Sequence, residues 1–188
     1  MARPLCLMGQ SSRRILGDPA GNQFCKTGTL VLETQNMWTG TVESIYIASA
    51  AQAPTQMVEQ VQAIPGVGLE GDRYALKQGT FFKPEPDFEL TLIEAEAIEA
   101  AKREYRVELS MGQARRNIVT RDVPLNHLVG KEFQIGDVRV RGIRLCEPCD
   151  HLQRLTGIPV IKSLRHRGGL RAQIVTAGLI RVGDRVSE

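Results

Sequence analysis

The sequence contains no run of apolar residues long enough to cross a lipid bilayer, which takes about 20 of them. Near the start, the apolar residues 4–8 follow Arg3 but are too few for the hydrophobic core of a secretion signal. Both absences argue against a membrane protein and against an exported one. We therefore expect a cytoplasmic protein that needs no membrane partner.

Cysteines are few and lack the spacing of a disulfide framework. The chain has four, at positions 6, 25, 146 and 149, and without a secretion signal we expect them to stay reduced. The charge is also nearly balanced, because 24 Lys and Arg residues against 21 Asp and Glu residues leave a net charge of +3. A charge of that size does not by itself imply nucleic acid, and we expect no nucleic-acid partner.

The length of 188 residues, with 42% hydrophobic and 24% charged residues, fits one globular domain whose core needs no disulfides. Residues 1–39 are rich in isolated glycines and polar residues and show no sustained hydrophobic period. We expect them to form an irregular N-terminal extension, either disordered or a start-site artefact. Residues 40–188 then form the folded domain.

Short alternating stretches predict that this domain consists mainly of β-strands, with a few helices. Turn residues bound strands at 41–48, 116–120, 171–176 and 179–186, and a hairpin over 133–145 that turns at Gly136 and Asp137. Residues 64–73 contain three glycines and a proline and predict a loop. Many short strands and few helices indicate a β-barrel within the α+β class.

Three segments predict helices. Thr91 and Glu94 have the spacing of a capping box, which predicts a helix that continues to about Tyr105. Residues 149–156 and 159–165 each predict a turn or two of helix.

Residues 144–151, Arg-Leu-Cys-Glu-Pro-Cys-Asp-His, are the most informative stretch of the chain. Cys146 and Cys149 follow an alternating apolar run, so they lie where a strand ends, and strand ends and loops are where rigid folds present reactive groups. Two thiols at this spacing can bind a metal, cycle as a disulfide or carry sulfur. Because Cys146 continues the strand pattern, it is also well explained as a small buried apolar residue.

Positive charge gathers around these cysteines. Between positions 139 and 171 the excess is six charges, from Arg139, Arg141, Arg144, Arg154, Lys162, Arg165, Arg167 and Arg171 against Glu147 and Asp150. Such an excess suits an anionic small molecule such as a phosphate. A solvated basic surface is the alternative interpretation.

Several further segments, taken together in their order, resemble the MOSC family, the domain found at the C-terminus of molybdenum-cofactor sulfurases and in standalone bacterial-type proteins. The resemblance extends from about Gly40 to Val186. Its motifs are Gly71-Asp72-Arg73, residues 90–93 (LTLI), 115–119 (RRNIV), 128–136 (LVGKEFQIG), 146–149 (CEPC), 167–172 (RGGLRA) and 180–186 (IRVGDRV). It implies a barrel-like β fold, a molybdenum pyranopterin cofactor or a sulfur-carrier role, and one functional cysteine, which maps to Cys149.

The resemblance also implies a set of site residues. Cys149 would be the catalytic thiolate and the ligand of molybdenum, a metal that favours soft sulfur donors when it is bound by a dithiolene. The surrounding cations favour the thiolate form. The cofactor-binding residues would be Arg73, Arg115, Asn117, Arg144, His166, Arg167, Gly168 and Arg171. Strand alternation places Arg115 and Asn117 on one face, so we favour these two over Arg116 for the phosphate end of the cofactor.

The resemblance to standalone members of the family implies that the protein reduces N-hydroxylated substrates by oxygen transfer. The chain has no cysteine-rich iron–sulfur motif and no glycine-rich dinucleotide loop after a strand. We therefore expect the electrons to come from a separate reductase, and we expect no requirement for pyridoxal phosphate. A partner protein of cofactor biosynthesis is the other expected partner.

Other interpretations of the cysteine pair stay open at this point. Cys149 could carry sulfur as a persulfide, with Cys146 resolving it, or the domain could store and hand over the cofactor without catalysis. A zinc site would combine the two cysteines with His151 and with His127 or His166, but a second ligand pair of regular spacing is missing. Gly71-Asp72-Arg73 could be only a turn in which Asp72 accepts bonds from backbone amides.

Overall fold

The computed structural model describes residues 38–188. Cys6, Cys25 and nearly all of the predicted extension 1–39 therefore lie outside the described residues. Two residues of that range are described, and both belong to the domain: Trp38 packs against the main hydrophobic core, and Thr39 is the first residue of strand β1.

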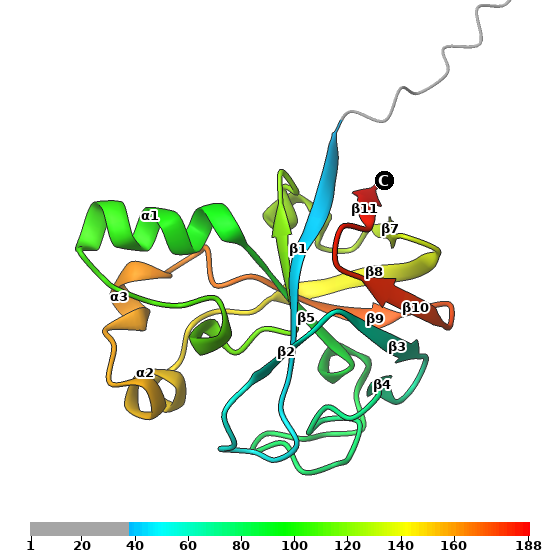
Figure 1. Cartoon of the computed structure of the whole chain (residues 1–188), viewed down its shortest axis with the longest axis horizontal. Helices are drawn as coiled ribbons and strands as arrows, with labels where there is room; N and C mark the ends of the chain where they lie inside the picture. Colours follow the sequence, from blue (N-terminus) through cyan, green and yellow to red (C-terminus); the bar gives the residue numbers. More distant parts are fainter. Residues whose placement is uncertain (1–37) are drawn as a thin grey trace, which may run out of the picture. The chain divides into compact units, whose positions relative to one another are not determined.

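Seven strands form a closed barrel, which confirms the prediction of a mainly β fold (Figure 1). In the order of their pairing they are β1 (Thr39–Ile47), β11 (Arg185–Ser187), β7 (Glu132–Ile135), β8 (Val138–Leu145), β9 (Leu170–Ile174), β5 (Leu90–Glu94) and β6 (Ile118–Arg121). The pairing of β11 with β1 closes the ring, so no barrel edge is left for an unintended partner.

Two smaller elements attach to this barrel. Strand β2 (Gln56–Val58) pairs with the last residues of β1, on the side of β1 away from β6. A second sheet has the order β10 (Gly178–Arg181), β3 (Gln60–Ile64) and β4 (Gly68–Leu69). The predicted strand 179–186 is thus two strands in different sheets, because the turn around Gly183 separates β10 from β11.

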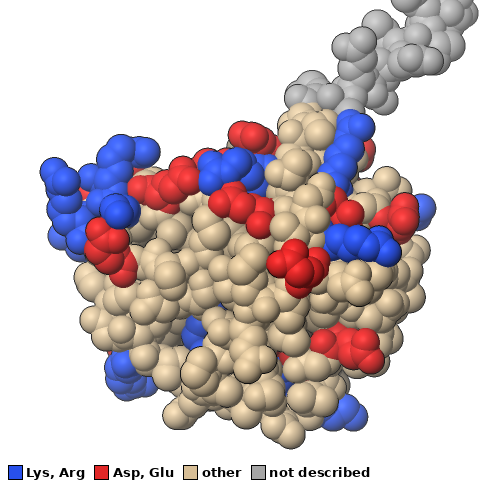
Figure 2. All heavy atoms as spheres, viewed as in Figure 1, with Lys and Arg blue, Asp and Glu red and all other residues tan. Residues whose placement is uncertain are grey.

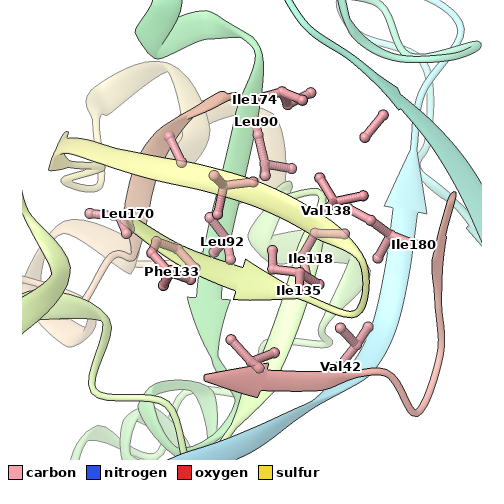
Figure 3. Close-up of a cluster of buried hydrophobic side chains, with 14 of the residues drawn as sticks. Val42, Leu90, Leu92, Ile118, Phe133, Ile135, Val138, Leu170, Ile174 and Ile180 are labelled. Atoms are coloured by element: carbon pink, nitrogen blue, oxygen red, sulfur yellow. The ribbon is translucent and has the colours of Figure 1, made fainter. Parts of the chain in front are cut away.

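The barrel interior is the main hydrophobic core. Phe133 and Ile135 of β7, Leu90 and Leu92 of β5 and Leu170 of β9 point into it and are almost completely buried (Figure 3). The burial pattern of β8 alternates between buried and exposed over its first residues, as a strand with one face on a core requires. The predicted hairpin 133–145 is confirmed, because β7 and β8 pair as antiparallel neighbours around Gly136.

Helices lie beside the barrel around a second core. They are α1 (Ala95–Tyr105), α2 (Asp150–Thr156) and α3 (Val160–Ser163), with short 3-10 turns η1 (Pro86–Phe88), η2 (Gly112–Ala114) and η3 (Leu125–Leu128). The second core joins α1 residues such as Ala97 and Ile98 to Leu152 of α2 and Leu164 after α3. Figure 1 shows all three α-helices gathered on one side. This places the start of α2, where Cys149 lies, next to the end of the barrel.

The predicted capping box is wrong. Residues 90–94 form strand β5, and the helix begins only at Ala95. The hydroxyl of Thr91 donates to Asn117 Oδ1 at 2.7 Å, and Glu94 accepts a bond from the Leu125 amide at 2.8 Å, so neither side chain caps the helix. Strand β5 pairs with β6 in parallel, and helix α1 forms the crossover that connects the two strands. Residues 91–94 therefore belong to a strand and not to the first turn of the helix.

No helix among residues 38–188 is both long enough and apolar enough to span a membrane.

Candidate functional site

A small cavity opens beside Cys149. Its wall contains both cysteines of the Cys-Glu-Pro-Cys segment, together with residues from the loop 73–88 and from the starts of β6 and β9. Its volume is about 80 Å³, a few times the roughly 30 Å³ that a water molecule occupies in the liquid. A group the size of a phosphate fits within it, whereas a complete pyranopterin would extend out through its mouth.

The two cysteines differ in exposure. Cys149 is exposed, and Cys146 is buried, with 5% of its surface accessible. Cys149 takes the N-cap position of α2 in an extended conformation, and its carbonyl accepts the first helical bond from the Gln153 amide. The fold thus presents the Cys149 thiol at the cavity, whereas Cys146 also packs as the small buried residue that the strand pattern indicates.

Four arginines line the cavity: Arg73, Arg115, Arg116 and Arg171. Among the described residues, the only acidic one in the lining is Glu147, and its two carboxylate oxygens are bonded to the backbone amide of His166 at 2.9 Å and to the His166 ring at 3.2 Å. Four guanidiniums outnumber the nearby carboxylates of Glu147 and of Asp72, which pairs with Arg73 at 3.2 Å, so the net charge is positive and suits an anionic ligand.

Arg115 and Arg116 both use backbone carbonyls as partners. Arg115 donates to the carbonyls of Ala53 and Ala51 at 2.8 and 2.9 Å. Burial lowers the pKa of Arg115, and the charge of Arg73 lowers it further. Arg116 donates to the carbonyls of Gly168 and Cys146, both at 2.8 Å, and is buried. Arg115 is half-buried and Arg116 is buried, and both guanidiniums are held by backbone carbonyls of neighbouring segments.

Arg171 is the least engaged of the four guanidiniums. Its Nη1 lies 3.4 Å from the carbonyl of Asp87, and its guanidinium stacks 4.6 Å from the centre of the Phe88 ring. Its Nε is buried and has no hydrogen-bond partner among the described residues. A buried donor without a partner is costly, and it leaves Arg171 with the fewest hydrogen bonds of the four lining arginines.

Asp72 holds the arginine side of the cavity in place. One carboxylate oxygen accepts bonds from the Ala48 amide, Arg73 Nη1 and Asn117 Nδ2 at 3.1–3.2 Å, and the other accepts from the Tyr74 amide at 3.1 Å. Asp72 is buried, so a full set of donors is what makes its charge tolerable. The Gly71-Asp72-Arg73 segment is therefore more than a turn, because it joins β1, β6 and the cavity wall.

Comparisons with known proteins identify the family of the domain. Residues 79–187, more than half of the chain, match the MOSC domain. The chain belongs to the MOSC domain family. No curated protein matches the sequence.

Solved structures show the same fold. YuaD from Bacillus subtilis is similar with a TM-score of 0.65 and 15% sequence identity, over 80% of this chain and 97% of that one. YiiM from Geobacillus stearothermophilus is similar with a TM-score of 0.62 and 13% identity, over 79% and 75% of the two chains. YiiM from Escherichia coli gives 0.53 and 16%, over 80% and 68%.

Asn117 does not line the cavity of this MOSC domain. Its Oδ1 accepts bonds from the amide and the hydroxyl of Thr91, and its Nδ2 donates to Tyr46 and Asp72. With every side-chain atom engaged inside the protein, it has a structural role. Arg116, which sequence analysis ranked behind Asn117, reaches the cavity instead.

Three predicted basic residues also lie outside the cavity, and each is bonded to an acid. Arg144 is paired with Asp87 at 2.7 Å, Arg167 with Glu104 at 2.9 Å, and His166 with Glu147. Gly168 lies behind the Cys-Glu-Pro-Cys segment, where an added Cβ would come within 2.5 Å of the Cys146 carbonyl oxygen. Arg73, Arg115, Arg171 and Cys149 are the predicted site residues that the structure brings together.

Aromatic residues at the cavity were missed by sequence analysis. Tyr74, Phe81 and Phe88 come from a turn-rich segment without hydrophobic period, so no pattern singled them out. Burial raises the pKa of Tyr74, partly opposed by the charges of Arg73 and Arg171. Phe81 contacts His151 of α2 edge to face, with 5.2 Å between ring centres, and so connects the loop to the helix that follows Cys149.

The donor set of the MOSC domain fits a cofactor with a soft metal and an anionic end. Cys149 offers an accessible thiol, and Arg171 offers a buried N–H without a partner. Within residues 38–188, no three His, Cys, Asp or Glu side chains come together as a metal-ligand set. Residues 38–188 therefore offer no closed zinc site of four protein ligands. They do offer one accessible thiol, which suits a metal that takes a single protein thiolate.

Proposed function

We propose that this MOSC domain binds a molybdenum pyranopterin through the Cys149 thiolate and reduces N-hydroxylated substrates with electrons from a separate protein. The observation that carries the proposal is the exposed Cys149 thiol in a cavity lined by four arginines and one carboxylate that is already bonded.

Each lining residue has a role in this proposal. The Cys149 thiolate would hold the metal, because its sulfur is exposed at the cavity. Arg171, with its unpartnered Nε, and Arg73 would bind anionic oxygens of the ligand. Arg115 and Arg116 already donate to backbone carbonyls, so they contribute positive charge and hold the wall rather than supplying all their donors to a ligand.

When bound, the cofactor would supply two-electron oxygen transfer. The overall reaction converts R–NHOH, two electrons and two protons into R–NH₂ and water. The electrons come from a one-electron carrier protein and the protons from water. The contribution of the chain is to orient the substrate, and Phe81 and Tyr74 at the cavity offer apolar faces beside the reacting group.

The proposal is tested on the full chain, expressed in a host that makes the cofactor. Molybdenum is measured by elemental analysis, and hydroxylamine reduction is measured with reduced methyl viologen as the electron source. We expect close to one molybdenum per chain, with turnover. Molybdenum without turnover would identify a cofactor carrier and overturn the proposed reaction.

A second candidate is a sulfur carrier, favoured by the presence of both Cys146 and Cys149 in the wall of one cavity. In this case the Cys149 thiolate attacks the outer sulfur of a donor protein's persulfide. A new S–S bond forms on Cys149, and the donor leaves as a thiolate. A mass gain of one sulfur on Cys149 in protein without molybdenum would support this candidate over the first.

A further inference from the structure

An open groove adjoins the Cys-Glu-Pro-Cys segment next to the cavity. Its volume is about 1130 Å³. Pro148 lines the groove, Cys149 lines the cavity, and Glu147 lines both. One peptide unit therefore separates a residue at the groove from the proposed metal ligand, a distance of about 3.8 Å between the Cα atoms of neighbouring residues.

This shared wall is firmly held. The Cys146 amide donates to the Gly169 carbonyl at 2.7 Å, and the Cys146 carbonyl accepts from Arg116 at 2.8 Å. Glu147 is held by its two bonds to His166, whose carbonyl in turn accepts a bond from Asn126 at 2.8 Å. A molecule that binds in the groove therefore meets a wall fixed in position next to Cys149.

The groove has an apolar floor and a basic lining. Tyr105 and Ile161 are each 38% exposed, large for apolar side chains, and Pro148 and Pro159 lie beside them. Lys162 and Arg165 supply positive charge, and the one carboxylate of the lining, Glu147, is occupied by His166.

More positive charge lies close to the groove. Tyr105 ends α1, whose last turn carries Lys102 and Arg103, and these two exposed cations pair with Glu108 and Glu104 at 3.1 Å. Figure 2 shows Lys and Arg side chains gathered over the end of the molecule where α1 terminates. Charge complementarity therefore favours a partner that presents carboxylates around a small apolar centre.

We propose that this groove is the docking site of the electron-donor protein, and that the donor binds with an acidic face. This inference rests on the proposed function, because it names the partner that the reaction needs. Each reduced N–OH bond takes two electrons, so the donor, a one-electron carrier with a flavin or an iron–sulfur cluster, binds and leaves twice per turnover. Docking at Pro148 brings the carrier within one residue of the Cys149 sulfur.

The test compares two double charge reversals. Lys162→Glu with Arg165→Glu changes the groove. The control, Arg139→Glu with Arg185→Glu, makes the same change in net charge at exposed residues that line neither the groove nor the cavity. The probe is plant-type [2Fe–2S] ferredoxin, an acidic one-electron carrier. Binding is measured by calorimetry at low and high salt, and hydroxylamine reduction is measured separately with reduced ferredoxin and with reduced methyl viologen.

We expect the groove variant to weaken ferredoxin binding and to raise the KM for ferredoxin by about tenfold or more, with the methyl viologen rate unchanged. The control pair should behave as the wild type does, and wild-type binding should weaken with salt. Equal effects of the two charge reversals would overturn the docking site, as would a wild type that does not bind ferredoxin at low salt. If the wild type shows no hydroxylamine reduction with methyl viologen, the proposed reaction is overturned. The calorimetry still decides in that case whether the groove binds the acidic carrier.

Discussion

Arg116 donates from Nη2 to the carbonyl oxygen of Cys146 at 2.8 Å, across 30 positions of sequence. The same guanidinium donates from Nε to the Gly168 carbonyl at 2.8 Å and from Nη1 to the Ala114 carbonyl at 3.2 Å. One buried cation therefore joins the start of β6, the approach to β9 and the first residue of the Cys-Glu-Pro-Cys segment. The segment that carries the proposed metal ligand, Cys149, is therefore held by Arg116 as well as by its connection to strand β8.

Arg116→Lys should destabilise the fold. A lysine cannot reach three carbonyls in different directions, and a buried group left without its partner costs about 1–3 kcal/mol. We expect a loss of about 2–4 kcal/mol, which corresponds to a fall in Tm of several degrees for a domain of this size. Thermal unfolding of Arg116→Lys and of the exposed control Arg185→Lys measures the difference. A variant as stable as the control would show that the three bonds are not needed to hold the wall.

Arg171→Gln should weaken anion binding while leaving the stability of the fold nearly unchanged, the reverse of Arg116→Lys. Its Nε has no partner in the described residues, and its guanidinium contact with Phe88 is worth about 0.5–1 kcal/mol. We expect Tm to change little and the affinity for inorganic phosphate to fall by about tenfold or more, because a charge-assisted donor is lost. Calorimetric titration with phosphate measures the affinity, with Arg116→Lys as the counterpart that loses mainly stability. Unchanged phosphate affinity would remove Arg171 from the anion site.

Phe81→Ala should change the preference between substrates. Phe81 is 47% exposed, lines the cavity and touches His151 with ring planes at 83°. A substrate ring that packs on Phe81 would gain about 0.5–1.5 kcal/mol from the aromatic pair, so KM for N-phenylhydroxylamine should rise by about two- to tenfold in the variant. Hydroxylamine itself, which has no ring to pack, should keep its kinetic constants. Parallel changes with both substrates would assign Phe81 to the fold rather than to substrate binding.

The free energy of unfolding of the domain should depend on the protonation of Glu89 at mildly acidic pH. Glu89 is buried and accepts a bond from the Ile174 amide at 3.0 Å, and burial raises its pKa above the usual 4.5. The folded state then binds the proton more readily than the unfolded state. The penalty of the buried charge is fully present above the folded pKa and is relieved as pH falls through it toward the unfolded value.

Glu89→Gln removes that titration. We expect the difference in unfolding free energy, variant minus wild type, to be largest near neutral pH. The difference should shrink as pH falls toward about 4.5, because the wild type then gains stability by protonating Glu89. Urea unfolding at a series of pH values gives both curves. Two parallel curves would mean that the Glu89 carboxyl titrates alike in the folded and unfolded states.

The fold could be predicted where periodicity and turn residues agree. The β7–β8 hairpin, α2, α3 and the closing strands have local patterns that tertiary packing reinforces. Residues 90–94 show where this fails, because Thr-x-x-Glu satisfies a helix-start rule while the chain is held in a strand by β6 and β9. Strand β3, with the sequence Gln-Val-Gln-Ala-Ile, was missed because its strand character depends on pairing with β10 across more than a hundred residues.

The site could be predicted only in part for a related reason. Alternation placed Arg115 with Asn117, but Arg115 has a left-handed backbone, with φ of 56°, at the end of η2, so it does not follow the strand alternation assumed for it. Arg144 and Arg167 looked free in the sequence, yet Asp87 and Glu104 pair with them from distant segments. Charge density along the chain indicates an anionic ligand, but long-range ion pairs decide which cations remain for it.

The most direct test of the account is the molybdenum content of two cysteine variants, purified from a host that makes the cofactor. Cys149 is exposed at the cavity, whereas Cys146 is buried and its contacts are with the backbone of the wall. We predict that Cys149→Ala retains almost no molybdenum, while Cys146→Ala keeps most of the metal found in the wild type. Loss of the metal in Cys146→Ala together with its retention in Cys149→Ala would contradict the account.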